Sequence, residues 1–130
     1  MRNDGKKLRL INVWATWCGP CLVELPEFVA MNRMYRRRDF ELITISADSP
    51  EDKAKALEML VAQQVSATNY LFDGNDKYKL MDAVDEKSLG PLPHTVLIAP
   101  GGKVLYSKSG SCEPMKIKKA IVGYLGRTYK

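Results

Sequence analysis

The sequence predicts an α/β fold with a mixed central sheet, and the order of its apolar segments carries this prediction. Segments 8–15 and 40–47 are almost continuously apolar, as strands covered on both faces are, and a long helical pattern lies between them. A strand, a helix and a strand in this order form a right-handed parallel unit. Segments 95–99 and 104–107 flank a turn at 100–102, which predicts an antiparallel hairpin. We therefore expect a parallel unit and then a hairpin, with helices on both faces of the sheet.

The first predicted helix follows the earlier buried strand and begins at Pro20, because proline fits a first helical turn. Apolar residues recur at helical spacing from Cys21 to Tyr35, and the charged residues Glu27, Arg33, Arg36 and Arg37 lie on other faces. Pro26 lies inside this stretch and is expected to kink the helix. The arginines at 36–38 lie where the helix should end, and cations there complement the helix dipole.

Two further helices are expected later in the chain. A cap residue, a proline and two acids at 49–52 predict a helix that runs to about Gln64, and Pro114 opens the last helix. Segment 70–72 is a candidate strand, and segment 77–83 is a candidate short helix. The apolar residues expected to face inward are Leu57, Leu60 and Val61 in the first of these helices and Ile117, Ile121, Tyr124 and Leu125 in the last.

Length and composition describe one globular domain. The 130 residues are 45% hydrophobic and 27% charged, enough apolar material for a core without a metal or disulfide framework. The net charge is +5, but the basic residues are scattered and no nucleic-acid motif accompanies them, so we expect no nucleic-acid partner. No apolar run is long enough to span a membrane, and no signal-peptide pattern is present. Because a strand begins within a few residues of Met1, we expect a soluble domain taken from a longer precursor.

The motif Trp17-Cys18-Gly19-Pro20-Cys21 lies between a buried strand and a helix and carries the chemistry. Residues three apart meet on one helical turn, so the two sulfurs can reach disulfide geometry with little backbone movement. Cys18 is expected at the helix N-terminus, where amides and the helix dipole favour a thiolate, and Cys21 one turn deeper. The exposed Cys18 would attack a substrate disulfide, and Cys21 would resolve the mixed disulfide.

Two other interpretations of the cysteine pair stay open. A zinc site needs more ligands, and although His94 and Cys112 could join the pair, a second paired-ligand motif is missing. A purely structural disulfide would close so short a loop that it contributes little chain entropy. Both are less favoured than redox activity. Because the chain has three cysteines, Cys112 is left over and is expected to be a free thiol.

Residues 12–21 read Asn-Val-Trp-Ala-Thr-Trp-Cys-Gly-Pro-Cys, residues 24–26 read Glu-Leu-Pro, and a proline-containing loop precedes the late hairpin. With these motifs the chain resembles the thioredoxin superfamily and, more closely, its TlpA/ResA-like branch of bacterial envelope thiol-disulfide oxidoreductases. The resemblance covers nearly the whole chain, including an insert at about 49–84 that distinguishes this branch from minimal thioredoxins. It implies a thioredoxin-like fold, with a single thioredoxin-like domain over 1–130 that belongs to a longer envelope protein.

The resemblance also implies substrate-binding residues. Pro93 matches the cis-proline that faces the cysteine pair in this superfamily, where it exposes the backbone of Leu92 to a substrate peptide and keeps metal away from the thiols. An ordinary turn proline is the alternative. Trp17, directly before the first cysteine, is placed to contact substrate, and we expect Gly19 and Pro20 to line the same binding surface.

Glu24 is the remaining catalytic candidate. It lies three residues beyond Cys21 on the same otherwise apolar face, so the helix should carry it inward beneath the sulfurs. Burial raises the pKa of a carboxyl group and lets it exchange protons near neutral pH. The envelope branch has glutamate at this position, whereas minimal thioredoxins keep an acid on the preceding strand, where this chain has Asn12. The alternative is a solvated acid that complements the helix dipole.

The resemblance implies an oxidoreductase that works by dithiol exchange and reduces disulfides of exported proteins, with apocytochrome c as one candidate. Its expected partners are these proteins and a transmembrane thiol reductant, and its expected location is the bacterial periplasm or another extracytoplasmic face, with any membrane anchor in a segment outside this sequence. We expect a monomer with no metal and no cofactor beyond the redox-active Cys18–Cys21 disulfide. The alternatives are a thiol peroxidase, whose attacking cysteine usually has no such partner, and a non-catalytic binding or metal-holding module.

Overall fold

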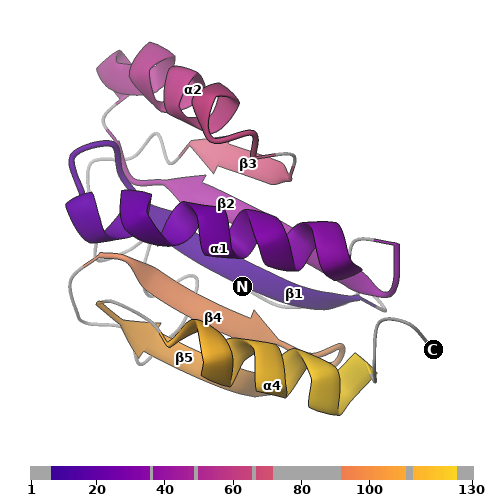
Figure 1. The fold of residues 1–130 in the computed structure, drawn as a ribbon. Helices are drawn as coiled ribbons and strands as arrows, with labels where there is room; N and C mark the ends of the chain where they lie inside the picture. Colours follow the sequence, from indigo (N-terminus) through magenta and orange to yellow (C-terminus); the bar gives the residue numbers. More distant parts are fainter. Residues whose placement is uncertain are drawn as a thin grey trace.

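The computed structural model describes residues 7–35, 37–48, 50–65, 67–71, 92–110 and 113–125. Within them, five strands form one mixed sheet in the order β3-β2-β1-β4-β5 (Figure 1). β1, β2 and β3 run parallel, and β4 is antiparallel to its neighbours β1 and β5, which confirms the predicted parallel unit and hairpin. The strands are β1 (Leu8–Trp14), β2 (Phe40–Ser46), β3 (Thr68–Leu71), β4 (His94–Ile98) and β5 (Val104–Ser109).

β1 lies in the middle of the sheet and sets the position of the cysteine motif, which follows it. Its pairing with β2 runs from Leu8 opposite Phe40 to Trp14 opposite Ser46. Because the two strands are parallel, the segments after Trp14 and Ser46 leave the sheet at the same edge. The residues that follow β1 therefore lie next to the residues that follow β2.

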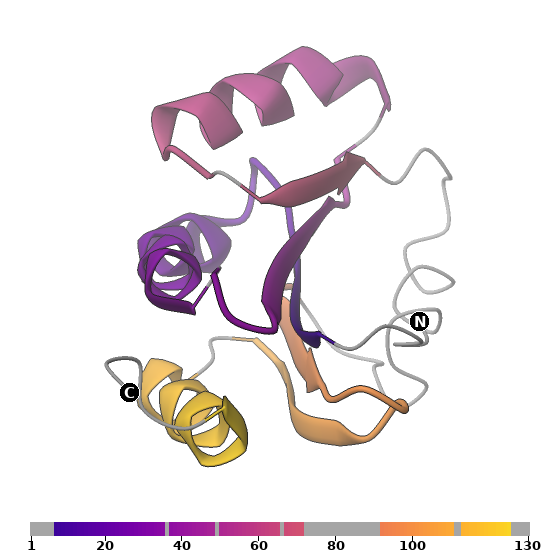
Figure 2. The same ribbon diagram turned by 90° about the vertical axis from the view of Figure 1, so that its right-hand side faces the viewer.

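The helices of the described residues are α1 (Gly19–Tyr35), α2 (Lys53–Ala62) and α4 (Pro114–Leu125), with a short 3-10 turn, η1 (Pro50–Asp52), directly before α2. α1 and α4 lie on the same face of the sheet, whereas α2 lies beside β3 at one edge, so the described helices do not show the predicted cover on both faces (Figures 1 and 2). α1 continues through Pro26 to its end at Tyr35. The cysteine motif therefore joins the central strand to a long helix that covers the sheet.

Apolar side chains pack on both faces of the sheet. On the helix face, Phe28, Met31 and Tyr35 of α1 share a buried cluster with Ile117 and Ile121 of α4. Each side chain of this size contributes about 1.5–3 kcal/mol when it leaves water, so packing is the main source of stability. The second buried cluster contains Ile11, Val13, Ile43, Ile45, Ala47, Val96 and Ile98.

Of the three residues of α2 predicted to face inward, Leu60 packs against a buried cluster, and the prediction is wrong for Leu57 and Val61. Leu57 and Val61 are 59% and 69% exposed, Leu60 is half-buried, and Ala56 is the buried residue of the helix. The physical reason is the position of α2 at the sheet edge, where a narrow stripe of the helix contacts the rest of the protein. Helical periodicity identifies an apolar face but not how much of that face another element covers.

Smaller differences concern the ends of elements. In α4, Tyr124 is exposed rather than buried, because the adjacent Leu125 occupies the inward position and packs against the core. The candidate strand at 70–72 is observed slightly earlier, as β3. The candidate helix at 77–83 and the third cysteine, Cys112, lie outside the described residues. None of the helices in the described part of the chain combines the length and the apolar character that a membrane span needs.

Candidate functional site

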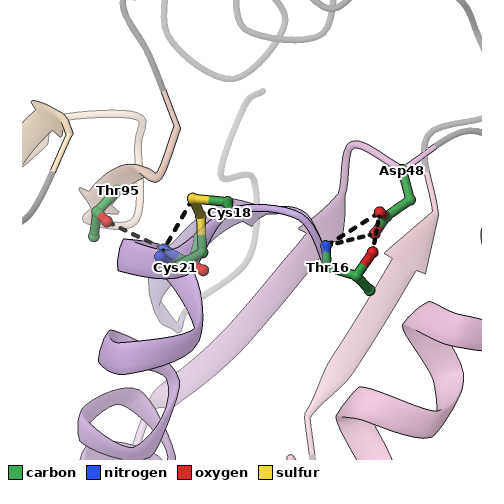
Figure 3. Close-up of a disulfide and its surroundings, with 6 residues drawn as sticks. Thr16, Cys18, Cys21, Asp48 and Thr95 are labelled. Carbon is green, nitrogen blue, oxygen red and sulfur yellow. Dashed lines mark hydrogen bonds between the residues drawn. A yellow bond between two sulfur atoms is a disulfide. The ribbon is translucent and has the colours of Figure 1, made fainter.

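The two cysteines of the motif lie at the N-terminal end of α1 and form a disulfide (Figure 3). Their Cα atoms are 5.3 Å apart, within the usual range for a disulfide. Cys18 precedes the first helical residue and is 6% exposed, whereas Cys21 is fully buried. The predicted order of accessibility therefore holds. Cys18 is more buried than expected, because it packs in an apolar cluster with Trp14 and Leu25.

The N-terminus of α1 supplies a donor to the sulfur of Cys18. The backbone N–H of Cys21 donates to Cys18 Sγ at 3.3 Å, and the N–H of Leu22 donates to the Cys18 carbonyl at 3.2 Å. Amide groups and the positive end of the helix dipole stabilise negative charge at such a position. Once the disulfide is reduced, this arrangement favours a thiolate at Cys18, the form of cysteine that attacks disulfides.

The two residues between the cysteines leave the site open. Gly19 and Pro20 are both exposed, and a Cβ atom added at Gly19 would meet no other heavy atom within 4 Å. The surface next to Cys18 is therefore open at Gly19, where no neighbouring side chain blocks an approaching partner.

The loop before β4 packs near the cysteine pair. The Leu92–Pro93 peptide bond is cis, as the resemblance implies. Pro93 is buried, and Leu92 is half-buried and packs against the apolar cluster that contains Cys18 and Cys21. The N–H of Gly110 donates to the Pro93 carbonyl at 2.7 Å, which ties this loop to the end of β5. The structure thus brings the two predicted parts of the site together.

Polar side chains at the start of β4 form hydrogen bonds to the neighbouring strands. His94 is 1% exposed, and its Nδ1 lies 2.9 Å from Oγ of Ser109 on β5. Asn12 of β1 donates from Nδ2 to Oγ1 of Thr95 at 3.2 Å. Among the described residues, no three His, Cys, Asp or Glu side chains are grouped as a metal site requires.

Glu24 lies on the buried side of α1, one turn beyond Cys21. It is 7% exposed, and its Oε1 atom is out of contact with solvent. The inward position is the predicted one, so the alternative of a solvated acid is wrong. Glu27 on the same helix is exposed and lies 3.5 Å from Lys118 of α4, which makes it a natural comparison for Glu24.

Trp17 is 59% exposed, although it is adjacent to the nearly buried Cys18. Together with Thr16 it lines a groove of about 550 Å³ that α2 completes. The α2 residues that line this groove are Lys55, Glu58, Met59 and Ala62. A large exposed aromatic ring beside a groove and a reactive sulfur is well placed to contact a polypeptide.

Sequence reasoning did not identify Asp48, which is 1% exposed and lies directly after β2. Thr16 contacts its carboxylate through two groups: the backbone nitrogen lies 3.1 Å from both oxygens, and the hydroxyl donates at 2.6 Å (Figure 3). The Ser46 hydroxyl donates to the same carboxylate at 2.6 Å. The contact follows from the parallel register of β1 and β2, which places Trp14 opposite Ser46 and therefore Thr16 near Asp48.

Comparison with known proteins identifies the family. The AhpC/TSA family model matches residues 3–107. Thiol-disulfide oxidoreductase ResA of Bacillus cereus is 30% identical over 131 residues, which cover 94% of this chain and 69% of the relative. ResA of Oceanobacillus iheyensis is 30% identical over 105 residues, which cover 78% of this chain and 48% of the relative. The chain thus spans between about half and about two thirds of the length of these relatives.

Solved structures show the same fold. A Chlorobium tepidum protein assigned as thiol:disulfide interchange protein DsbE superposes with a TM-score of 0.75 at 22% identity, covering 95% of this chain and 83% of that chain. A thioredoxin-related protein from Neisseria meningitidis gives a TM-score of 0.74 at 24% identity, covering 90% and 84%. The predicted thioredoxin-like fold is confirmed. The chain belongs to the AhpC/TSA family and, within it, to the ResA-like thiol-disulfide oxidoreductases.

Proposed function

We propose that this domain reduces disulfide bonds in proteins by dithiol exchange. The Cys18 thiolate attacks one sulfur of the substrate disulfide, forms a mixed disulfide and releases the other substrate sulfur as a thiol. Cys21 then attacks the Cys18 sulfur, closes the Cys18–Cys21 disulfide and releases the second substrate thiol. The substrate gains two electrons and two protons, and the cysteine pair loses them.

One observation carries the assignment of the two roles. Cys18 lies outside the first helical turn, retains some exposure and accepts a hydrogen bond from the Cys21 amide at 3.3 Å, whereas Cys21 is fully buried. Cys18 is thus the cysteine of the pair with some contact to solvent, and a protein disulfide would reach it before Cys21. Cys18 therefore acts as the nucleophile and Cys21 as the resolving thiol.

Glu24 is the proposed proton carrier for this exchange. Cys21 must lose its proton before it attacks, and a new substrate thiol must gain one. A buried carboxyl group is more readily protonated than a solvated one, so it can hold and return a proton near neutral pH. The burial of Glu24 on the same helix face as Cys21 supports this role.

The substrate surface is proposed to lie on both sides of Cys18. Trp17 and the groove beside α2 would contact the polypeptide on one side. Gly19 and Pro20 give open access, and the backbone at Leu92, before the cis-proline Pro93, would pair with an extended substrate segment. Redox exchange of this kind needs no metal or further cofactor.

The proposed biological setting is supported by the relatives. ResA-like family membership supports a domain that faces an extracytoplasmic compartment such as the bacterial periplasm, where disulfides form and persist. Its substrates would be exported proteins, apocytochrome c among them, and a transmembrane thiol reductant would return Cys18 and Cys21 to the dithiol state. The domain is proposed to act as a monomer.

Reduction of insulin disulfides by dithiothreitol, followed by turbidity, tests the proposed function. The wild-type chain should accelerate reduction, Cys18→Ser should abolish the acceleration, and the matched control Cys112→Ser should retain it. Equal activity of wild type and Cys18→Ser would overturn the proposal. Consumption of hydrogen peroxide by the wild-type chain, without insulin reduction, would instead indicate a thiol peroxidase.

A further inference from the structure

Asp48 is a buried carboxylate that the proposed thiol exchange does not use. An isolated carboxylate is expensive to bury, so its partners must compensate for the lost water. Here the compensation comes from the Thr16 amide and hydroxyl and from the Ser46 hydroxyl, at 2.6–3.1 Å. The Ser46 oxygen in turn accepts a hydrogen bond from the Asp48 amide at 3.1 Å. Hydrogen bonds to an ionised acceptor are about twice as strong as neutral ones.

The position of these bonds matters because Thr16 lies in the connection between β1 and Cys18. At the start of this connection, the Ala47 N–H donates to the Trp14 carbonyl at 2.7 Å. At its end, the Cys18 N–H donates to the carbonyl of Ala15 at 3.1 Å. Asp48 binds the middle of the connection from the neighbouring strand end, as Figure 3 shows. The carboxylate therefore fixes the segment that leads directly into the nucleophile.

We infer that Asp48 is a positioning residue for Cys18. By holding Thr16, it keeps Cys18 Sγ at the N-terminus of α1, beside the Cys21 amide, and keeps Trp17 at the rim of its groove. It acts as a hydrogen-bond acceptor, because its oxygens are directed to Thr16 and Ser46. The inference rests on the proposed function in so far as Cys18 is the attacking thiol.

Four variants separate this role from a general effect on folding. Asp48→Ala removes the acceptor, and Asp48→Asn keeps one oxygen for Thr16 while its amide group can donate to Ser46. Thr16→Ala removes one donor from the connection. Ser46→Ala is the matched control, because it removes a bond of similar length from the same carboxylate without touching the connection.

The measurements are the iodoacetamide alkylation rate of the reduced Cys18 thiol, the Cys18–Cys21 equilibrium with glutathione, and thermal unfolding. Asp48→Ala should slow alkylation about tenfold and shift the glutathione equilibrium, because a small misplacement of a reacting group is costly. Thr16→Ala should slow alkylation several-fold. Asp48→Asn and Ser46→Ala should stay near the wild-type rate, even where their melting temperatures fall.

A folded Asp48→Ala variant that reacts at the wild-type rate would overturn the inference. Asp48→Asn reacting as slowly as Asp48→Ala would also overturn it, because the charge rather than the acceptor would then matter. Should Asp48→Ala fail to fold, a wild-type rate in Thr16→Ala would have the same meaning. Alkylation needs no protein substrate, so a chain that fails to reduce insulin but keeps this pattern would refute the proposed function alone.

Discussion

α1 and α2 differ in how deeply they are buried, although both follow strands of the parallel half of the sheet and both have apolar residues at helical spacing. α1 lies across the sheet and buries eight residues, among them Cys21 and Glu24. α2 lies at the sheet edge, buries Ala56 and leaves Leu57 and Val61 exposed. The comparison shows two things. A buried acid on the deeply packed helix α1 is a candidate catalytic group. Apolar residues on the edge helix α2 lie on the protein surface.

Truncation of an apolar side chain should give the largest difference between the two helices in the free energy of unfolding. Phe28→Ala on α1 should lower the free energy of unfolding by about 3–5 kcal/mol, because Phe28 is fully buried between helix and sheet. Leu57→Ala on α2 should change it by less than about 0.5 kcal/mol, because Leu57 is 59% exposed. Urea denaturation of both variants measures the difference. Equal losses would show that α2 is packed as deeply as α1.

The next comparison is between the buried Glu24 and the exposed Glu27 of α1. Glu24→Gln should lower kcat for disulfide reduction by about a hundredfold at neutral pH and flatten its pH profile, because a proton carrier is lost. Glu27→Gln should leave both unchanged, since Glu27 is exposed and pairs with Lys118 on the surface. Stopped-flow kinetics of the two variants between acidic and alkaline pH provides the measurement. Identical profiles for wild type and Glu24→Gln would exclude Glu24 as the carrier.

The groove beside Trp17 lies between the segment that precedes α1 and the helix α2. Trp17→Ala and Met59→Ala should each raise KM for a peptide disulfide by about fivefold with little change in kcat, because they remove contact area and not reacting atoms. Val61→Ala, on an exposed part of α2 outside this groove, is the control. An unchanged KM in both groove variants would place the substrate elsewhere.

An exposed acid should have the smallest effect. The hydrogen bond with Lys116 is the main cause that holds the pKa of Glu113 below its ordinary value of 4.5; desolvation opposes it, and the charges of Lys116 and Lys108 add to the lowering. The folded state favours the carboxylate, so its contribution to stability is complete above pH 4.5 and is lost as the pH falls through the lowered pKa. Glu113→Gln should lower the melting temperature slightly at neutral pH and not in strong acid or high salt. A larger difference in acid would contradict this account.

The sequence predicted the parts of this fold that local patterns determine. Continuous apolar runs identified β1 and β2, and a cysteine pair at helical spacing identified the start of α1. The inward position of Glu24 was also predictable, because its helix face is otherwise apolar. The exposure of Leu57 and Val61 was not, because it depends on where α2 lies relative to the sheet edge. The contact between Thr16 and Asp48 required the register of β1 and β2, which no local pattern gives.

The most direct test of the account is to identify which cysteine forms the mixed disulfide. A Cys21→Ser chain, reduced and then mixed with a peptide that contains a disulfide, cannot complete the second exchange and should accumulate the first adduct. Peptide mapping by mass spectrometry should locate that adduct at Cys18, with Cys112 unmodified. An adduct at Cys112 alone, or no adduct while the wild-type chain remains active, would contradict the assignment of Cys18 as the nucleophile.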